Sequence, residues 1–128
     1  MHYTKHFTLP EAETLLHEVI PVITEIVRLK KELDGKGYDV HRHQYFGGLG
    51  PNGQKVFPME MEKLVLLVRE LNDRGIEIKD LEKGLIDFPH LRENGEEVYL
   101  CYMLGEKKIL AWHTLDGGFS GRQSITEL

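Results

Sequence analysis

The spacing of the apolar residues changes at Gly75, and this change limits the possible folds more than any other feature of the chain. Upstream of Gly75, apolar side chains recur at steps of three and four residues, which is the period of an amphipathic helix. Downstream of it, apolar and polar residues alternate, as in IEIKDL at 76–81, which indicates a β-strand. A chain that is helical first and extended afterwards is typical of an α+β domain.

The first helix is predicted over residues 8–34 and has a well-defined start. Thr8 and Glu11 have the spacing of a capping box, and Pro10 stands in the first turn, where a missing N–H is harmless. Pro21 removes one backbone hydrogen bond from the interior of the helix, so we expect a kink there. The apolar seam of this helix consists of Ala12, Leu16, Val19, Ile23, Ile26 and Leu33.

A second helix is predicted over residues 57–74, with Gly75 ending it. Its apolar stripe is expected to face that of the first helix. The two would then form an antiparallel hairpin over residues 8–74, joined by the glycine-rich connector 35–57.

The remaining residues, 76–128, are predicted to form a sheet and a C-terminal motif region. The strongest hairpin signal is EVYLCYML and KKILAWHT around a Gly-Glu turn, at 97–114. The stretch DFPHLRENGEE, at 87–97, contains a proline and an Asn-Gly pair and is predicted to be a loop. We therefore expect a single α+β domain over residues 1–128, with two long antiparallel helices packed on a small antiparallel sheet of about three strands.

A two-residue turn fixes which side chains share a face of this hairpin. It places His113 on the face of Val98 and Leu100, and it places Cys101 on the opposite face with Trp112. Both faces are apolar, so the second face must also be covered, by this chain or by a second copy. The first helix has more apolar surface off its seam than one partner helix would cover. Together these features predict a homodimer.

Composition and charge exclude several classes of function. The formal net charge is −5, and no stretch has the clustered Lys and Arg that nucleic-acid binding needs. No apolar run reaches the ~20 residues of a membrane helix. The single cysteine, Cys101, excludes an internal disulfide and is typical of a reducing compartment. We therefore expect a cytoplasmic protein that binds neither nucleic acid nor membranes.

The candidate site lies in the C-terminal third of the chain. Glycines within 117–121 permit a backbone nest for an anion, and Arg122 can clamp a carboxylate or a phosphate. His113 can carry a proton or donate a hydrogen bond. We predict a pocket for a small anionic metabolite, with the ligand-binding residues Asp87, Glu106, Trp112, His113 and Arg122.

A structural interpretation of the same residues stays open. Arg122 can pair with Asp87 or Glu106 as a buried tie, and Phe119 can fill the core. The alternative function is then a structural or interaction module that homodimerises through the first helix, with C-terminal motifs that only stabilise the fold.

Metal binding is the third possibility. Asp87, Cys101 and His113 have the chemistry of metal ligands, but the predicted register separates Cys101 from His113. His41 and His43 form an H-x-H pair in the connector, without a further ligand at a telling spacing. No metal and no cofactor is therefore assigned from the sequence.

The runs GLIDFP, LCYMLGE and WH…GFSGR, with the start FTLPEAETLLHEVIPVI, resemble an uncharacterised bacterial family, domain of unknown function 2203. The similarity covers nearly the whole chain, although Tyr102 stands where the family commonly has tryptophan. The resemblance implies a small cytoplasmic bacterial protein and brings no established activity, so it leaves open whether the chain is an enzyme. The positions that match the family's motifs are Asp87, Phe88, Pro89, Cys101, Gly105, Glu106, Trp112, His113, Gly118, Phe119, Gly121 and Arg122.

Overall fold

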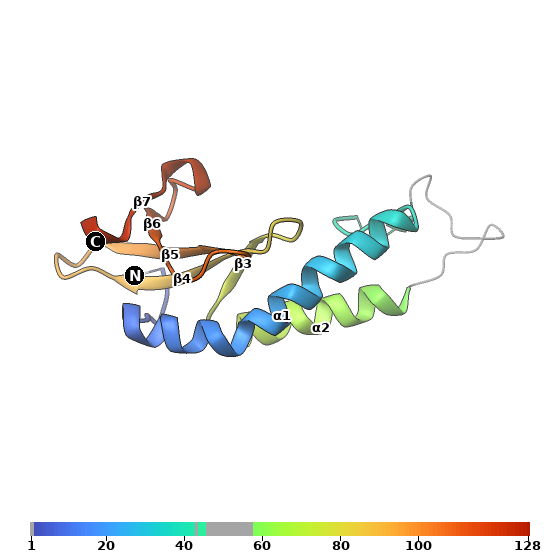
Figure 1. The fold of residues 1–128 in the computed structure, drawn as a ribbon, viewed down its shortest axis with the longest axis horizontal. Helices are drawn as coiled ribbons and strands as arrows, with labels where there is room; N and C mark the ends of the chain where they lie inside the picture. Colours follow the sequence, from blue (N-terminus) through green and yellow to red (C-terminus); the bar gives the residue numbers. More distant parts are fainter. Residues whose placement is uncertain (1, 43, 46–57) are drawn as a thin grey trace.

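The computed structural model describes residues 2–42, 44–45 and 58–128. Two helices form one layer, an antiparallel sheet forms the second, and the C-terminal segment lies on the far side of the sheet (Figure 1). The predicted α+β class is confirmed. The prediction of two long helices on about three strands is wrong in detail, because the helices differ in length and the larger sheet has five strands.

Helix α1 spans Leu9–Gly35 and has 27 residues, whereas helix α2 spans Met59–Asp73 and has 15. The predicted capping box is present at the start of α1. The Thr8 hydroxyl accepts from the Glu11 N–H, and the Glu11 carboxylate accepts from the Thr8 N–H. The axis of α1 changes direction near its middle (Figure 1). Pro21, which removes one backbone hydrogen bond, lies inside this helix.

Both helices end just before a glycine with a left-handed backbone, Gly37 at φ 72° and Gly75 at φ 88°. After the first of these, β1 (Tyr38–Asp39) and β2 (Gln44–Tyr45) form a short antiparallel ladder. The remaining part of the predicted connector, residues 43 and 46–57, lies outside the described residues.

The larger sheet is an antiparallel meander in which each strand pairs with the next along the chain, in the order β3-β4-β5-β6-β7. Two short 3₁₀ helices lie in the C-terminal segment, η2 before β7 and η3 after it. The strands are β3 (Glu77–Asp80), β4 (Leu85–Leu91), β5 (Glu97–Met103), β6 (Ala111–Thr114) and β7 (Gln123–Ser124), and the 3₁₀ helices are η2 (Phe119–Gly121) and η3 (Ile125–Glu127).

The loop predicted at 87–97 is wrong, because its first half belongs to β4 and only the part around the Asn-Gly pair turns. Pro89 is tolerated in the strand for a geometric reason. Its carbonyl oxygen accepts from the Phe7 N–H at 2.7 Å, on the side away from β5. A strand residue directs its N–H and C=O to the same side, so the N–H that Pro89 lacks would have pointed beyond the end of β3.

The predicted two-residue turn between β5 and β6 is also wrong. The Glu106 N–H donates to the Met103 carbonyl oxygen, and residues 107–110 do not join the ladder. Cys101 therefore lies opposite Ala111 instead of residue 110. This change of one residue moves His113 to the face that carries Cys101, and it moves Trp112 to the other face.

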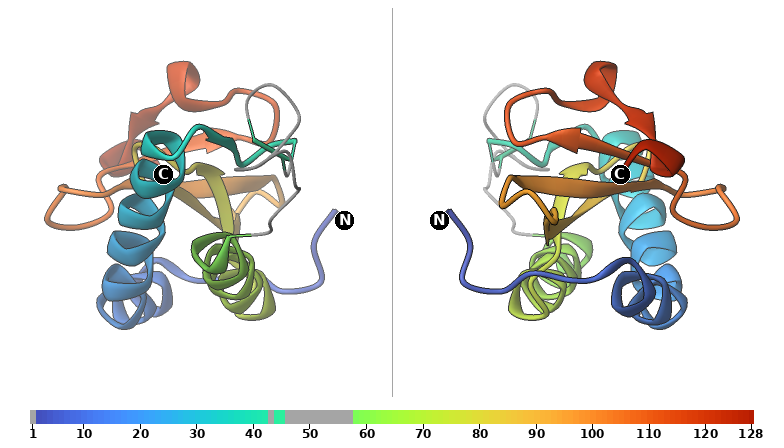
Figure 2. Two further views of the ribbon diagram at one scale, coloured as in Figure 1. Left: turned by 90° about the vertical axis from the view of Figure 1, so that its right-hand side faces the viewer. Right: turned by 90° about the vertical axis from the view of Figure 1, so that its left-hand side faces the viewer.

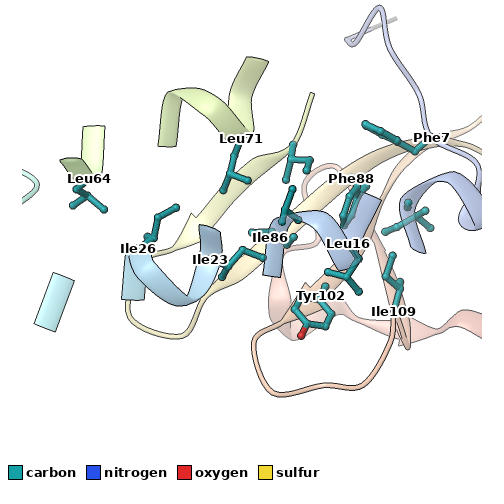
Figure 3. Close-up of a cluster of buried hydrophobic side chains, with 14 of the residues drawn as sticks. Phe7, Leu16, Ile23, Ile26, Leu64, Leu71, Ile86, Phe88, Tyr102 and Ile109 are labelled. Carbon is teal, nitrogen blue, oxygen red and sulfur yellow. The ribbon is translucent and has the colours of Figure 1, made fainter. Parts of the chain in front are cut away.

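One face of the sheet packs on the two helices and forms the hydrophobic core (Figure 3). Leu16 and Ile23 of α1 and Leu71 of α2 meet the sheet there and are buried. This placement follows from the predicted seam and stripe of the helices, which turn toward the strands and toward each other. The strand residues on this face are Ile86, Phe88, Val98, Leu100, Tyr102 and Trp112.

The opposite face is buried too, and the chain covers it with its own two ends. Tyr3 of the N-terminal segment contacts Tyr99, and the segment that carries β7 and η2 lies over the strands on this side (Figures 1 and 2). The off-seam apolar residues of α1 are buried or partly buried within the chain. Both surfaces that predicted a homodimer are thus covered to a large extent in one chain. Within the described ranges, no helix is long and apolar enough to cross a membrane.

Candidate metal centre

Three buried polar side chains meet on the face of the sheet turned away from the helices. Asp87 of β4 lies directly opposite Cys101 of β5. His113 of the adjacent strand β6 lies opposite Tyr99, two residues before Cys101 on β5. Their exposed fractions are 1%, 0% and 3%. Because three neighbouring strands supply one residue each, the rigid ladder sets their relative positions.

The orientation of the His113 ring is fixed by hydrogen bonds at both nitrogens. Nδ1 lies 2.7 Å from the carbonyl oxygen of Thr114, which can only accept, so Nδ1 carries a proton. Nε2 therefore faces Asp87, at 3.1 Å from each of its carboxylate oxygens. A contact of this kind requires a proton on Nε2 or on the carboxyl group, so the pair shares one proton in the absence of any other cation.

Burial and charge act on the ionisation of this cluster. Burial by itself lowers the pKa of His113, but the hydrogen bond and negative charge of Asp87 outweigh it and raise the pKa. For Cys101, burial and then the charge of Asp87 raise the pKa to about 12. Without a bound metal ion, Cys101 is therefore a neutral thiol at physiological pH.

The three residues fit a metal ion of the zinc type. One ligand atom from each lies within 4.8 Å of the others, and this is the one such group among the described residues. Around tetrahedral zinc, metal–ligand distances of about 2.0–2.3 Å place ligand atoms about 3.3–3.8 Å apart, so side-chain shifts of about an ångström suffice. The carbonyl bond at Nδ1 is the outer contact that metal-bound histidines usually make.

Arg122 and Glu106 form an ion pair at the edge of this cluster. Nη2 of Arg122 donates to both Glu106 oxygens, at 3.1 and 3.0 Å, and Glu106 also accepts the Met103 N–H at 2.7 Å. The predicted in-chain partner of Arg122 is therefore present. Phe119 does not fill the core, because it is 42% exposed, and the Arg122 guanidinium lies 5.0 Å from its ring centroid.

Trp112 lies apart from the other predicted site residues. Its side chain is buried on the helix-facing side of the sheet, where the guanidinium of Arg92 stacks 4.6 Å from the ring centroid. Of the five residues predicted to bind a ligand, Asp87 and His113 meet in the buried cluster. Glu106 and Arg122 form the adjacent ion pair, and Trp112 belongs to the core. Of the H-x-H pair, His41 is exposed and His43 lies outside the described residues.

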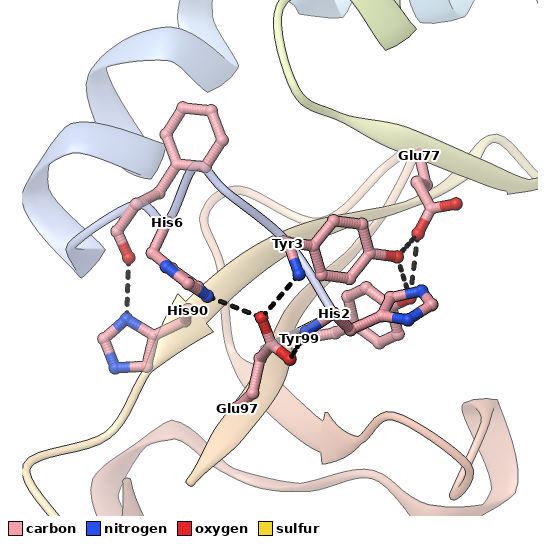
Figure 4. A network of polar contacts seen from close by, with 8 residues as sticks. His2, Tyr3, His6, Glu77, His90, Glu97 and Tyr99 are labelled. Atoms are coloured by element: carbon pink, nitrogen blue, oxygen red, sulfur yellow. Dashed lines mark hydrogen bonds and ion pairs between the residues drawn. The ribbon is translucent and has the colours of Figure 1, made fainter. Parts of the chain in front are cut away.

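A second polar network, drawn in Figure 4, lies beside the cluster and contains none of the predicted site residues. The Tyr3 and Tyr99 hydroxyls both contact the Glu77 carboxylate, and the Tyr99 ring centroid lies 5.2 Å from that of His113. Period-two alternation along β5 by itself places residues 97, 99 and 101 on one face. The contribution of Tyr3 could not be foreseen, because its contact spans the length of the chain.

Glu97, at the start of β5, binds the N-terminal segment through hydrogen bonds. Its carboxylate accepts the backbone N–H groups of His2 and Tyr3, at 2.8 and 2.9 Å. It also contacts Nε2 of His6 at 2.6 Å (Figure 4). The N-terminal segment is thereby held against the sheet beside Tyr99, whose ring lies next to that of His113.

Comparison with known proteins gives a family and no activity. The model of a family described as an uncharacterized conserved protein (DUF2203) matches residues 5–125. No curated protein and no solved structure matches the chain.

Proposed function

The chain belongs to the DUF2203 family, and we propose that it binds one divalent transition-metal ion, zinc being the best match, at Asp87, Cys101 and His113. The observation that carries the proposal is the convergence of these three side chains, buried, from three adjacent strands. Without a metal ion, the Asp87 carboxylate is desolvated and one proton shared with His113 offsets its charge.

The donor atoms decide the class of metal. A thiolate sulfur, an imidazole nitrogen and a carboxylate oxygen suit zinc and its neighbours in the first transition series. Magnesium and calcium prefer oxygen ligands and would have no use for Cys101 or His113. The ligand set therefore favours Zn²⁺ over the hard cations.

Charge balance supports the same assignment. Ionised Asp87 and Cys101 together carry two negative charges, which a divalent ion neutralises, and His113 binds as the neutral ring. The ion replaces the proton shared by Asp87 and His113 and the proton on the Cys101 thiol. The buried site is then neutral overall, as the low dielectric of the interior requires.

The reason for assigning no metal from the sequence was the predicted register, and that register is wrong. The predicted pocket for an anionic metabolite has weaker support as a separate site, because Arg122 pairs with Glu106 and Trp112 lies in the core. Homodimerisation through the first helix also has weaker support, because that helix buries most of its apolar surface within the chain.

Metal analysis of the purified protein tests the proposal. We expect about one zinc ion per chain, or one Co²⁺ bound with a sulfur-to-cobalt charge-transfer band in the near ultraviolet. Cys101→Ser should abolish the band, and Asp87→Asn and His113→Gln should weaken binding. His17→Gln, an exposed histidine on α1, is the matched control. If the wild type holds no metal and gives no thiolate band with Co²⁺, the proposal is wrong.

A further inference from the structure

We infer that the metal ion at Asp87, Cys101 and His113 has a coordination position open to a small oxyanion, a carboxylate or a phosphate, which Arg122 holds from the other side. This inference rests on the proposed metal centre. It names the class of ligand that the centre would bind, and it assigns Arg122 a function beyond that of a structural ion pair.

The first argument is the number of protein donors. Zinc in proteins is commonly four-coordinate, and a site with three protein ligands keeps the fourth position for water or substrate. The cluster has three donors, and no fourth His, Cys, Asp or Glu within the described part of the chain joins it. Glu106 and Tyr99 are engaged elsewhere, Glu106 by Arg122 and Met103 and Tyr99 by Glu77.

The second argument is the incomplete pairing of Arg122. Only Nη2 bonds to Glu106, with both oxygens sharing the one nitrogen, in place of the parallel two-nitrogen fork that guanidinium groups favour. Nε is buried and has no hydrogen-bond partner among the described residues. A buried N–H without an acceptor is costly, and an oxyanion next to the metal would supply one.

The third argument is the position of Arg122 relative to the cluster. In the β6–β7 register Gln123 pairs with Trp112, so Arg122, the residue before Gln123, lies beside His113 at the β6 edge of the cluster. Arg122 also reaches the surface, where its guanidinium and the Lys83 ammonium lie 5.0 and 5.9 Å from the exposed ring of Phe119. An anion that approaches this end of the sheet therefore meets the Lys83 ammonium and the Arg122 guanidinium, the latter paired with Glu106.

The incoming anion would compete with Glu106 for the guanidinium. This competition gives two variants with opposite expected effects. Arg122→Gln removes the clamp and should weaken oxyanion binding by about 10- to 100-fold, the value of a hydrogen bond to a charged group. Glu106→Gln removes the competing carboxylate and should tighten binding. If the ion pair were purely structural, both variants would change the oxyanion affinity in the same direction.

The experiment is a titration of the full-length Co²⁺ protein, followed by its visible absorption. Acetate and inorganic phosphate are the two probes, and perchlorate at equal ionic strength is the control. We expect a saturable change of the visible bands with acetate or phosphate, with the better probe identifying the carboxylate or the phosphate as the preferred group. Lys108→Gln, an exposed lysine, is the control variant.

The outcomes separate the two proposals. If Co²⁺ gives no thiolate spectrum in the wild type, the metal centre itself is wrong, and this inference falls with it. If the spectrum forms but neither anion changes it, only the oxyanion position is wrong. If either anion acts and the Arg122 and Glu106 variants shift its affinity in the same direction or not at all, the role of Arg122 is refuted.

Discussion

Asp87 and Cys101 face each other directly across β4 and β5, on the side of the sheet that the helices do not cover. A carboxylate opposite a thiol has little value for sheet packing, since a pair of apolar side chains would bury the same area without a desolvation cost. The addition of His113 on the neighbouring strand makes the arrangement a ligand set.

Metal binding is expected to strengthen as the pH rises. The ion must displace one proton from the Asp87–His113 pair and one from Cys101, so acid competes with the metal for the same atoms. Competition titrations between about pH 6 and about pH 8 should show rising affinity, with about two protons released per ion in weakly buffered solution. An affinity that does not change over this range would contradict the proposed ligands.

The metal-free protein should show the opposite dependence on pH. The pKa of His113 in the folded state is raised above its ordinary value of 6.5, so the Asp87–His113 pair contributes fully below that value. Its contribution to the free energy of unfolding is lost as the pH rises through the folded-state pKa. In urea unfolding of chelator-treated protein, the free energy of unfolding should therefore fall as the pH rises above 6.5. This fall should be absent in Asp87→Asn.

Removal of one partner of this pair should destabilise the metal-free fold. His113→Ala leaves the Asp87 carboxylate buried without a counter-charge, which typically costs about 3–5 kcal/mol. The double variant with Asp87→Asn should recover part of this loss, because the uncompensated charge is gone. Equal stability of the single and double variants in urea would show that the carboxyl group is already neutral.

Cys101 is expected to be unreactive in the native metal-free protein. It is fully buried and its pKa is raised to about 12, so neither access nor thiolate favours attack on a disulfide reagent. The thiol should react at the rate at which the protein opens, and that rate should increase with urea. Rapid stoichiometric labelling under native conditions would mean that the cover formed by the terminal segments opens readily.

Glu97 should make the attachment of the N-terminal segment sensitive to acid. Burial opposes ionisation of Glu97, but the His6 ring and the His2 N–H outweigh it and lower the pKa below 4.5. Its stabilising contribution is thus present above pH 4.5 and is lost as the pH falls through the lowered value. Glu97→Gln should remove this part of the acid dependence, whereas exposed Glu93→Gln should leave it unchanged.

Gly84, in the turn between β3 and β4, is predicted to be intolerant of a side chain. Its φ is +66°, and an added Cβ would lie 2.8 Å from Cβ of Leu104 and 3.0 Å from Cγ2 of Ile23. Gly84→Ala should therefore lower the free energy of unfolding by about 2–4 kcal/mol, through backbone strain and overpacking. Gly35→Ala is the matched control, because an added Cβ there meets nothing within 4 Å.

The sequence was sufficient for features that depend on nearby residues. The Thr8–Glu11 capping box, the end of α2 before Gly75 and the change from helical to extended structure are encoded within a few positions each. The sequence also sufficed to predict Asp87 and His113 as site residues. Burial of Trp112 agrees with the general behaviour of a lone tryptophan in a strand.

Only the tertiary structure decided which of those residues share a site. Pro89 enters a strand because Phe7, far away in the sequence, meets its carbonyl on the open side of β4. The longer connection before β6 shifts the register by one residue, and this places Cys101 and His113 on one face. Successive side chains of a strand point to opposite faces, so a one-residue change inverts every assignment. Local patterns therefore determined the elements of this protein, and long-range pairing determined its candidate metal centre.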